Sequence, residues 1–181
     1  MGNAYYSITG DVPLVLVKSA NLRTGNMQKS ELKEIFNDWD TLELVDFQAW
    51  LKLRGWKAIC DGMWKLVYRR DDVVIKFDAN GDTGRGSHTA YEYRQWLYAR
   101  PHKRKYLLKP IAYHRGLLVT PRLPNICSRR YSCECDGVDA IARRLRICDW
   151  KNHGFTASGK LKFFDSDSFG TGWYNWKERQ K

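Results

Sequence analysis

A chain of 181 residues and 21.2 kDa is long enough for one domain, or for one domain with an N-terminal extension, and its 43% hydrophobic residues predict a packed core. No apolar run approaches the roughly 18 residues that a membrane span requires, so we expect no membrane partner. The net charge of +11 comes from residues 61–181, where 24 Lys and Arg outnumber 13 Asp and Glu, and it indicates an acidic partner such as nucleotide phosphates, nucleic acid or an acidic protein.

Residues 1–55 predict a mostly helical N-terminal extension. Val12–Val17 is typical of a short strand, and a helix is expected to start with Ser30 as its N-cap. A second helix is expected from Asp46 to about Arg54. Both helices carry apolar residues at helical spacing and should cover the sheet that follows. These residues are Leu32, Ile35, Phe36, Trp39, Phe47, Trp50 and Leu51.

From Trp56 the apolar pattern becomes that of short strands. Gly62 and the pair Asp71-Asp72 mark turns, and a Gly-rich polar loop occupies residues 78–87. A helix is expected to follow, from about Thr89 to Ala99. The strands should form an antiparallel meander: Trp56–Cys60, Trp64–Arg69 and Val73–Phe77.

The second half of the chain predicts another strand pair and another helix. The strands are expected at Leu107–Tyr113 and Gly116–Leu123. The strongly basic run Arg100–Lys105 precedes them. A helix from about Gly137 to Cys148, apolar on one face, leads to the last element.

The last element is a predicted β-hairpin with a polar residue at each end. Its strands would be His153–Thr156 and Leu161–Phe164, joined by a turn at Gly159. Asn152 precedes the first strand and Asp165 follows the second. An amide oxygen and a carboxylate brought together in this way suit Mg²⁺, which takes few protein ligands.

The order of these elements resembles that of the protein-kinase-like superfamily. Val73–Lys76 (VVIK) resembles the VAIK strand, and Glu92 resembles the glutamate that pairs with its lysine. Asn152 and Asp165 resemble the asparagine of the catalytic loop and the aspartate of the DFG segment. The resemblance covers about residues 56–168 and is closest to the short kinase-like proteins that some bacteriophages encode.

This resemblance implies an α+β fold with a minimal kinase-like domain at residues 56–181. The domain would have an antiparallel N-lobe sheet plus helix and a reduced C-lobe, preceded by the extension at residues 1–55. The implied activity is transfer of a phosphoryl group from ATP with Mg²⁺ to Ser or Thr of a protein. Without a secretory signal pattern the expected location is the cytoplasm, or the host cytoplasm if a phage encodes the chain.

The resemblance also implies roles for individual residues. Lys76 would neutralise the nucleotide phosphates, Glu92 would position Lys76, and Asp149 would orient or deprotonate the acceptor hydroxyl. The segment Leu117–Leu123 would run into the hinge, whose backbone takes the adenine. The remaining implied contacts are the metal ligands Asn152 and Asp165 and the nucleotide-binding residues Gly62, Thr120 and Leu123.

Three departures from the family pattern leave open whether the chain is an active enzyme. The segment CDGMWKLVY contains one glycine, Gly62, where a Gly-rich loop is expected. Ile147 occupies the position of the catalytic aspartate, and Asp149 stands two residues later. Asp-Ser-Asp replaces DFG from Asp165, and 16 residues follow this aspartate.

Other readings therefore stay open. A catalytically degenerate kinase fold would bind and inhibit a partner or host protein through its basic half, including Arg143-Arg144. A nucleic-acid-binding protein is also possible, because basic clusters adjoin Tyr98 and Tyr106. Thiolate ligands for zinc are present without paired CxxC spacing, at Cys127, Cys133, Cys135 and Cys148.

Overall fold

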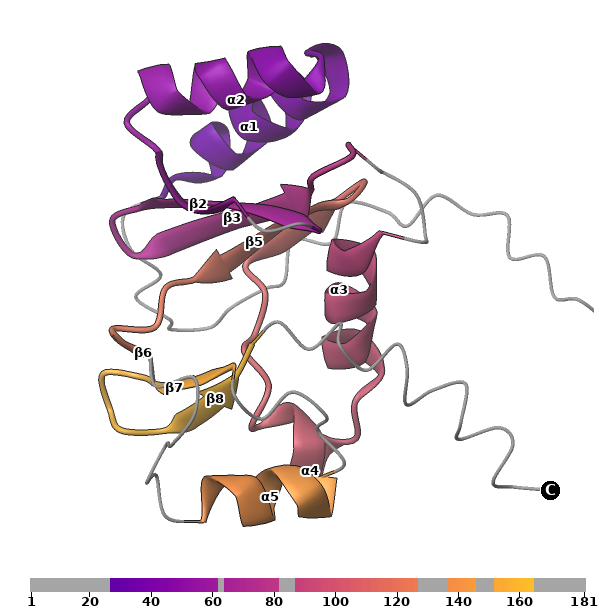
Figure 1. Ribbon diagram of the computed structural model, residues 1–181, viewed down its shortest axis with the longest axis vertical. Helices are drawn as coiled ribbons and strands as arrows, with labels where there is room; N and C mark the ends of the chain where they lie inside the picture. The colour runs from indigo at the N-terminus through magenta and orange to yellow at the C-terminus, as the bar shows by residue number, and fades with distance from the viewer. Residues whose placement is uncertain (1–26, 62–63, 82–86, 127–136, 146–151, 165–181) are drawn as a thin grey trace, which may run out of the picture.

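The computed structural model describes residues 27–61, 64–81, 87–126, 137–145 and 152–164. In these ranges the chain is a mixed α+β protein with five helices and two antiparallel sheets (Figure 1). None of the helices described is long and apolar enough to cross a membrane. The expected strand Val12–Val17 lies outside the described residues, as does Gly62.

The larger sheet has five strands in the order β1-β2-β3-β5-β4, and every neighbouring pair is antiparallel. The expected meander forms its first three strands. A tight turn at Asp71, whose φ is +50°, joins the second strand to the third. Gly116, with φ of +83°, supplies the left-handed conformation in the turn between the last two. The strands are β1 (Lys57–Asp61), β2 (Lys65–Arg70), β3 (Val73–Asp78), β4 (Ala112–His114) and β5 (Leu117–Pro121).

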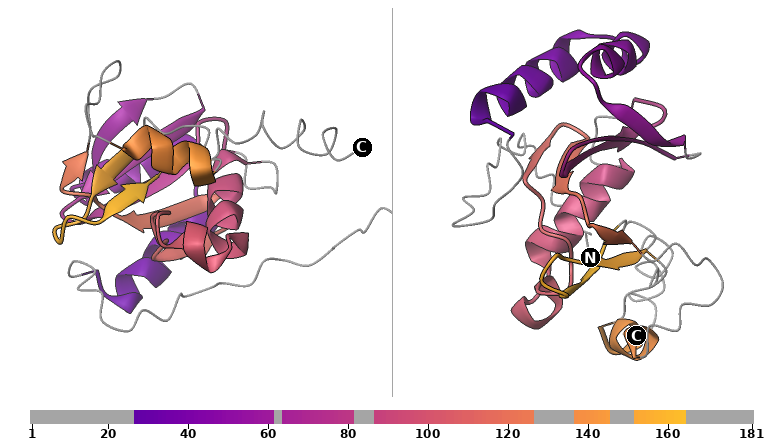
Figure 2. Two further views of the ribbon diagram at one scale, coloured as in Figure 1. Left: turned by 90° about the horizontal axis from the view of Figure 1, so that it is seen from below. Right: turned by 90° about the vertical axis from the view of Figure 1, so that its left-hand side faces the viewer.

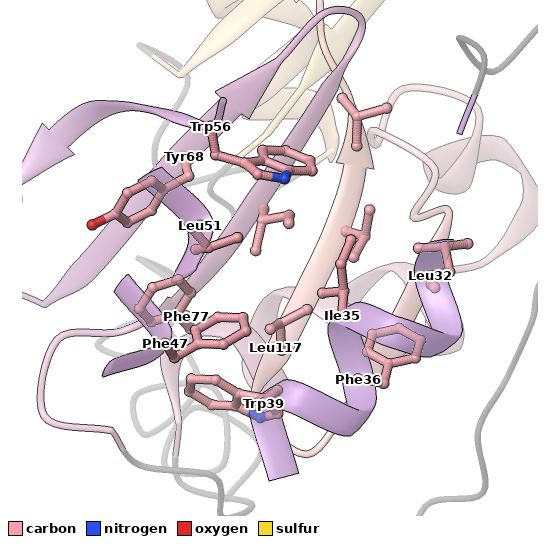
Figure 3. Close-up of a cluster of buried hydrophobic side chains, with 14 residues drawn as sticks. Leu32, Ile35, Phe36, Trp39, Phe47, Leu51, Trp56, Tyr68, Phe77 and Leu117 are labelled. Atoms are coloured by element: carbon pink, nitrogen blue, oxygen red, sulfur yellow. The ribbon is translucent and has the colours of Figure 1, made fainter. Parts of the chain in front are cut away.

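Helices α1 (Lys29–Thr41) and α2 (Leu44–Leu53) cover one face of this sheet, as the sequence predicts (Figure 1). Their apolar stripes and the odd-numbered residues of β3 form one buried cluster (Figure 3). Phe47 is fully buried there and packs edge-on against Phe77 with ring centres 5.5 Å apart. Because the strand period is two, the even-numbered residues of β3 face the other way.

The N-cap of helix α1 lies two residues earlier than the sequence predicts, so Ser30 is inside the helix and is not its N-cap. The N-cap is Gln28, whose carbonyl accepts the backbone N–H of Leu32 at 3.2 Å. Met27 and Leu32 join the same apolar cluster, which is the arrangement of a hydrophobic staple. This contact fixes the start of the helix, and the Ser30 hydroxyl donates instead to the Gln28 side chain at 3.5 Å.

The opposite face of the sheet packs against α3 (His88–Tyr98), as Figure 1 shows. Ser87 is its N-cap, because the Ser87 hydroxyl accepts the backbone N–H of Ala90 at 3.1 Å. The basic run Arg100–Lys105 follows α3. It forms a short helix, α4 (Pro101–Arg104), with proline in the first turn, where its missing N–H is tolerated.

A smaller sheet and α5 (Val138–Leu145) form the far end of the molecule from α1 and α2 (Figure 2). The hairpin expected between residues 152 and 165 is present, with β7 (His153–Phe155) paired to β8 (Leu161–Phe163) and Gly159 in its turn at φ +75°. A two-residue strand, β6 (Asn125–Ile126), pairs with β7 and was not expected. Helix α5 lies within the predicted range 137–148, of which residues 146–148 lie outside the described part.

The predicted strand Leu107–Tyr113 is wrong in its first half. Only Ala112–His114 pairs with β5. Leu107 and Leu108 instead run alongside Phe163, whose carbonyl accepts the N–H of Leu108 at 2.8 Å. The buried side chains of Leu107 and Phe163 share a second apolar cluster with α5, so tertiary pairing overrides the local strand pattern.

Candidate functional site

A buried ion pair joins the centre of the large sheet to α3. Lys76 Nζ donates to Glu92 Oε1 at 2.8 Å, and the two residues are 16 positions apart in the sequence. Lys76 is 5% exposed and Glu92 6%. On β3, Lys76 lies between Val67 of β2 and Leu118 of β5. The structure therefore brings together the lysine and the glutamate that the kinase-like resemblance pairs.

The start of α3 is tied to the end of β3, and this tie sets the position of Glu92. The buried carboxylate of Asp78 accepts the backbone N–H groups of His88 at 2.8 Å and Thr89 at 3.2 Å. The Thr89 hydroxyl donates to the carbonyl of Gly116 at 2.5 Å. A carboxylate at a helix N-terminus is also favoured by the helix dipole. The helix is thus fixed to the end of β3 and to the β4–β5 turn, and Glu92 faces the sheet one turn later.

Lys65, the first residue of β2, is a second lysine at the same carboxylate. Its Nζ lies 3.6 Å from Glu92 Oε2, and the residue is 8% exposed. Burial favours the neutral form of Glu92, but the two ammonium groups outweigh it, and the net effect lowers the pKa of Glu92 below its usual range. Glu92 is therefore ionised at neutral pH.

The end of the hairpin reaches this cluster. Lys76 Nζ lies 5.6 Å from the centre of the Phe164 ring, and the backbone N–H of Phe164 donates to the carbonyl of Asn152 at 2.9 Å. The two ends of the hairpin are therefore joined beside Lys76. Asp165 is the next residue in the chain and lies outside the described part.

A close backbone approach holds the hairpin against β6. A Cβ at Gly154 would lie 2.6 Å from the carbonyl oxygen of Asn125, so only glycine fits this position. His153 is fully buried between the Phe155 and Phe163 rings. It is a strand residue of the core, as the sequence predicts, and not an exposed base.

Thr120 and Leu123, the two described residues that the resemblance assigns to nucleotide binding near the hinge, differ in what they face. Thr120 on β5 lies opposite Val74 of β3, on the sheet face that carries Lys76. It is 2% exposed, and its hydroxyl has no hydrogen-bond partner among the described residues. Leu123 packs against the hairpin, where its Cδ1 would lie 3.1 Å from a Cβ at Gly154. Thr120 is thus suitably placed for a ligand near Lys76, and Leu123 helps to dock the hairpin.

Several predicted site residues lie outside the described residues: Gly62, Asp149 and Asp165, together with the cysteines at 127, 133, 135 and 148. In the described part of the chain, no cluster of three or more His, Cys, Asp or Glu residues could hold a metal ion. The predicted Mg²⁺ pair has only one member there, Asn152.

Lys65 and Asp78 are functional candidates that the sequence reasoning missed, although a signal for both was present. A two-residue turn at Asp71-Asp72 fixes the β2–β3 register, which places Lys65 opposite Asp78 and on the same face as Lys76. Extending the predicted hairpin by this register would have found both residues.

An open pocket of about 450 Å³ between α3, α4 and β8 was also missed. Arg104, Lys105, Lys109 and Lys162 line it with Trp96, and none of its described lining residues is acidic. Lys162 Nζ donates to the carbonyl of Lys105 at 2.6 Å. Burial, and then the charge of Lys160, lower the pKa of Lys162.

No protein-family model matches this chain, and a search of curated proteins finds no match. We therefore infer a function from the geometry of the site.

Proposed function

We propose that this protein is an ATP- and Mg²⁺-dependent phosphotransferase of the protein-kinase-like type, acting on Ser or Thr of a protein in the cytoplasm. The observation that carries the proposal is the buried Lys76–Glu92 ion pair, with the closed end of the Asn152–Phe164 hairpin beside it. A lysine held in a fixed position by a glutamate on the next helix is what an enzyme needs to orient the phosphates of ATP.

Phosphoryl transfer is catalysed mainly by positioning and charge. The protein needs cations on the phosphates, a held Mg²⁺ and an oriented acceptor hydroxyl. Lys76 would supply the cation, because Glu92 and the surrounding sheet restrict its ammonium group. Asn152 and Asp165 would bind Mg²⁺, and the metal would neutralise negative charge on the phosphates. Asp149 would receive or orient the proton of the acceptor.

The direct test is incubation with γ-labelled ATP, Mg²⁺ and a general protein acceptor such as casein. The wild-type chain should transfer label to itself or to the acceptor, and Asp165→Ala should abolish the transfer. Asp139→Ala, which removes an exposed carboxylate on α5, is the matched control and should transfer as the wild type does. Absence of transfer, together with no thermal stabilisation by Mg-ATP, would overturn the proposal. Stabilisation without transfer would indicate a degenerate kinase fold instead.

A second candidate function is favoured by the basic pocket. Four cationic side chains around Trp96 suit the phosphate backbone of a single-stranded nucleic acid. The affinity for a labelled oligonucleotide should fall about tenfold or more as the salt concentration rises from about 50 to about 200 mM. Lys109→Glu should weaken it further, and Lys57→Glu, an exposed lysine on β1, should affect it less. An oligonucleotide affinity that changes neither with the salt concentration nor in Lys109→Glu would rule out nucleic-acid binding at this pocket.

A further inference from the structure

Lys65 needs an explanation beyond the neutralisation of Glu92. Lys76 already supplies that carboxylate with a counter-charge at 2.8 Å, and Lys65 lies 3.6 Å from its other oxygen. Burying an ammonium group is costly. Asp78, opposite Lys65 in the register, adds a second buried carboxylate to this face, but it already accepts two backbone N–H groups at the start of α3. The chain has nevertheless buried a second lysine at the same point.

The sheet register explains how the two lysines come together. Val67 lies opposite Lys76, and Lys65 lies opposite Asp78, two residues further along the same strand pair. Residues separated by two on neighbouring strands point to the same face and are within reach of each other when the side chains are long. Both lysines therefore face α3, and Glu92 contacts both from there.

The position of Lys65 in the sequence is informative as well. It follows directly on the segment Cys60–Trp64, where the kinase-like pattern predicts a Gly-rich loop and this chain has only Gly62. Backbone N–H groups of such a loop hold the phosphates of the nucleotide in that pattern. A chain with one glycine there needs another source of positive charge for the same phosphates.

We propose that Lys65 is a second phosphate-binding residue of the nucleotide site. It would contact the phosphates that the backbone of a Gly-rich loop holds in the kinase-like pattern. The inference rests on the proposed function, and its ligand class is the triphosphate group of a nucleoside triphosphate. An ammonium group has three donors, so a contact with Glu92 does not prevent one with a phosphate oxygen. Glu92 then orients two cations, one from β2 and one from β3.

The test compares three variants for binding of Mg-ATP and of adenosine, which lacks phosphates, by isothermal titration calorimetry. Lys65→Gln removes the charge but keeps a donor for Glu92, Lys65→Arg keeps the charge, and Lys57→Gln alters an exposed strand lysine as the control. Lys65→Gln should weaken Mg-ATP binding about tenfold or more and leave adenosine binding unchanged. Lys65→Arg should recover most of the affinity, and Lys57→Gln should match the wild type.

Equal affinity of Lys65→Gln and wild type for Mg-ATP would overturn the inference while leaving the proposed function intact. A parallel loss of adenosine binding would also overturn it, because it would show a structural role. If wild type binds no Mg-ATP at all, the proposed function fails, and the inference fails with it.

A measurement on wild-type protein removes any dependence on the folding of the variants. An acyl-phosphate derivative of ATP acylates lysine amines that lie beside the bound phosphates. The acyl group is transferred to the amine as an amide and ATP leaves. Mass spectrometry should find label on Lys65 and Lys76, and an excess of Mg-ATP during the reaction should prevent labelling of both. Label on Lys76 without label on Lys65 would contradict the proposal.

Discussion

Glu92→Gln, on α3, should be the most destabilising polar substitution in the described part of this buried ion-pair cluster. The change keeps the volume of the side chain but removes the negative charge from the 2.8 Å contact with Lys76 and the 3.6 Å contact with Lys65. Removing one partner of a buried ion pair typically costs about 3–5 kcal/mol. Because a domain of this size has a free energy of unfolding of about 5–15 kcal/mol, the loss is a large fraction of its stability.

Lys76→Met should cost less, about 1–3 kcal/mol, because Lys65 still faces the carboxylate that remains. The control is Glu34→Gln, which removes a carboxylate from a half-exposed ion pair with Arg54 and should scarcely change stability. Urea unfolding followed by circular dichroism measures all three. A loss for Glu92→Gln no larger than that for Glu34→Gln would refute the electrostatic account of the site.

The Lys76–Glu92 pair makes the stability of the protein depend on pH, and the sign of this dependence follows from the pKa of Glu92. The folded state lowers the pKa of Glu92, so this group contributes stability above its unfolded pKa of about 4.3, and the contribution is lost as the pH falls through the lower folded value. The acid limb of the stability curve should therefore be shallower in Glu92→Gln. Parallel curves for the variant and the wild type would show that Glu92 has no such role.

Three further predictions concern the elements that position the site. Asp78→Asn weakens two charge-assisted hydrogen bonds at the start of α3, to His88 and Thr89, and should cost about 1.5–3 kcal/mol in urea unfolding, with faster amide exchange in the first turn of the helix; unchanged exchange there would count against this cap. Phe47→Ala empties a fully buried position between Trp39 and Phe77 and should cost about 3–5 kcal/mol, whereas a loss under about 1 kcal/mol would mean that α2 is not part of the core. Gly154→Ala brings a methyl group within 2.6 Å of the Asn125 carbonyl and should cost about 1–3 kcal/mol, and a neutral result would show that β6 does not press on the hairpin.

Where local pattern and tertiary packing agree, the sequence predicts the structure well. The three-strand meander follows from alternating apolar residues and short polar turns. The Asn152–Phe164 hairpin follows from its glycine turn, and the contact between Lys76 and Glu92 is the one that the kinase-like resemblance implies. These features depend on residues close in the chain or on one strand-to-helix step.

Where distant segments decide, the sequence predicts less. Leu107 has a strand pattern but lies against Phe163, 56 positions away, and β6 exists only because β7 is there to pair with it. The start of α1 depends on Met27 reaching the apolar cluster. The residues that line the basic pocket come from α3, α4 and β8, so the sequence of no single segment predicts the pocket.

We propose that the Lys76–Glu92 pair and the end of the hairpin form one site for ATP and Mg²⁺. Calorimetric titration of ATP with Mg²⁺ and again with EDTA tests it most directly. We predict that Mg²⁺ tightens ATP binding, that Asp165→Ala removes the effect of the metal, and that Lys76→Met weakens binding in both conditions. An ATP affinity that is the same with and without Mg²⁺, and the same in all three proteins, would contradict the account.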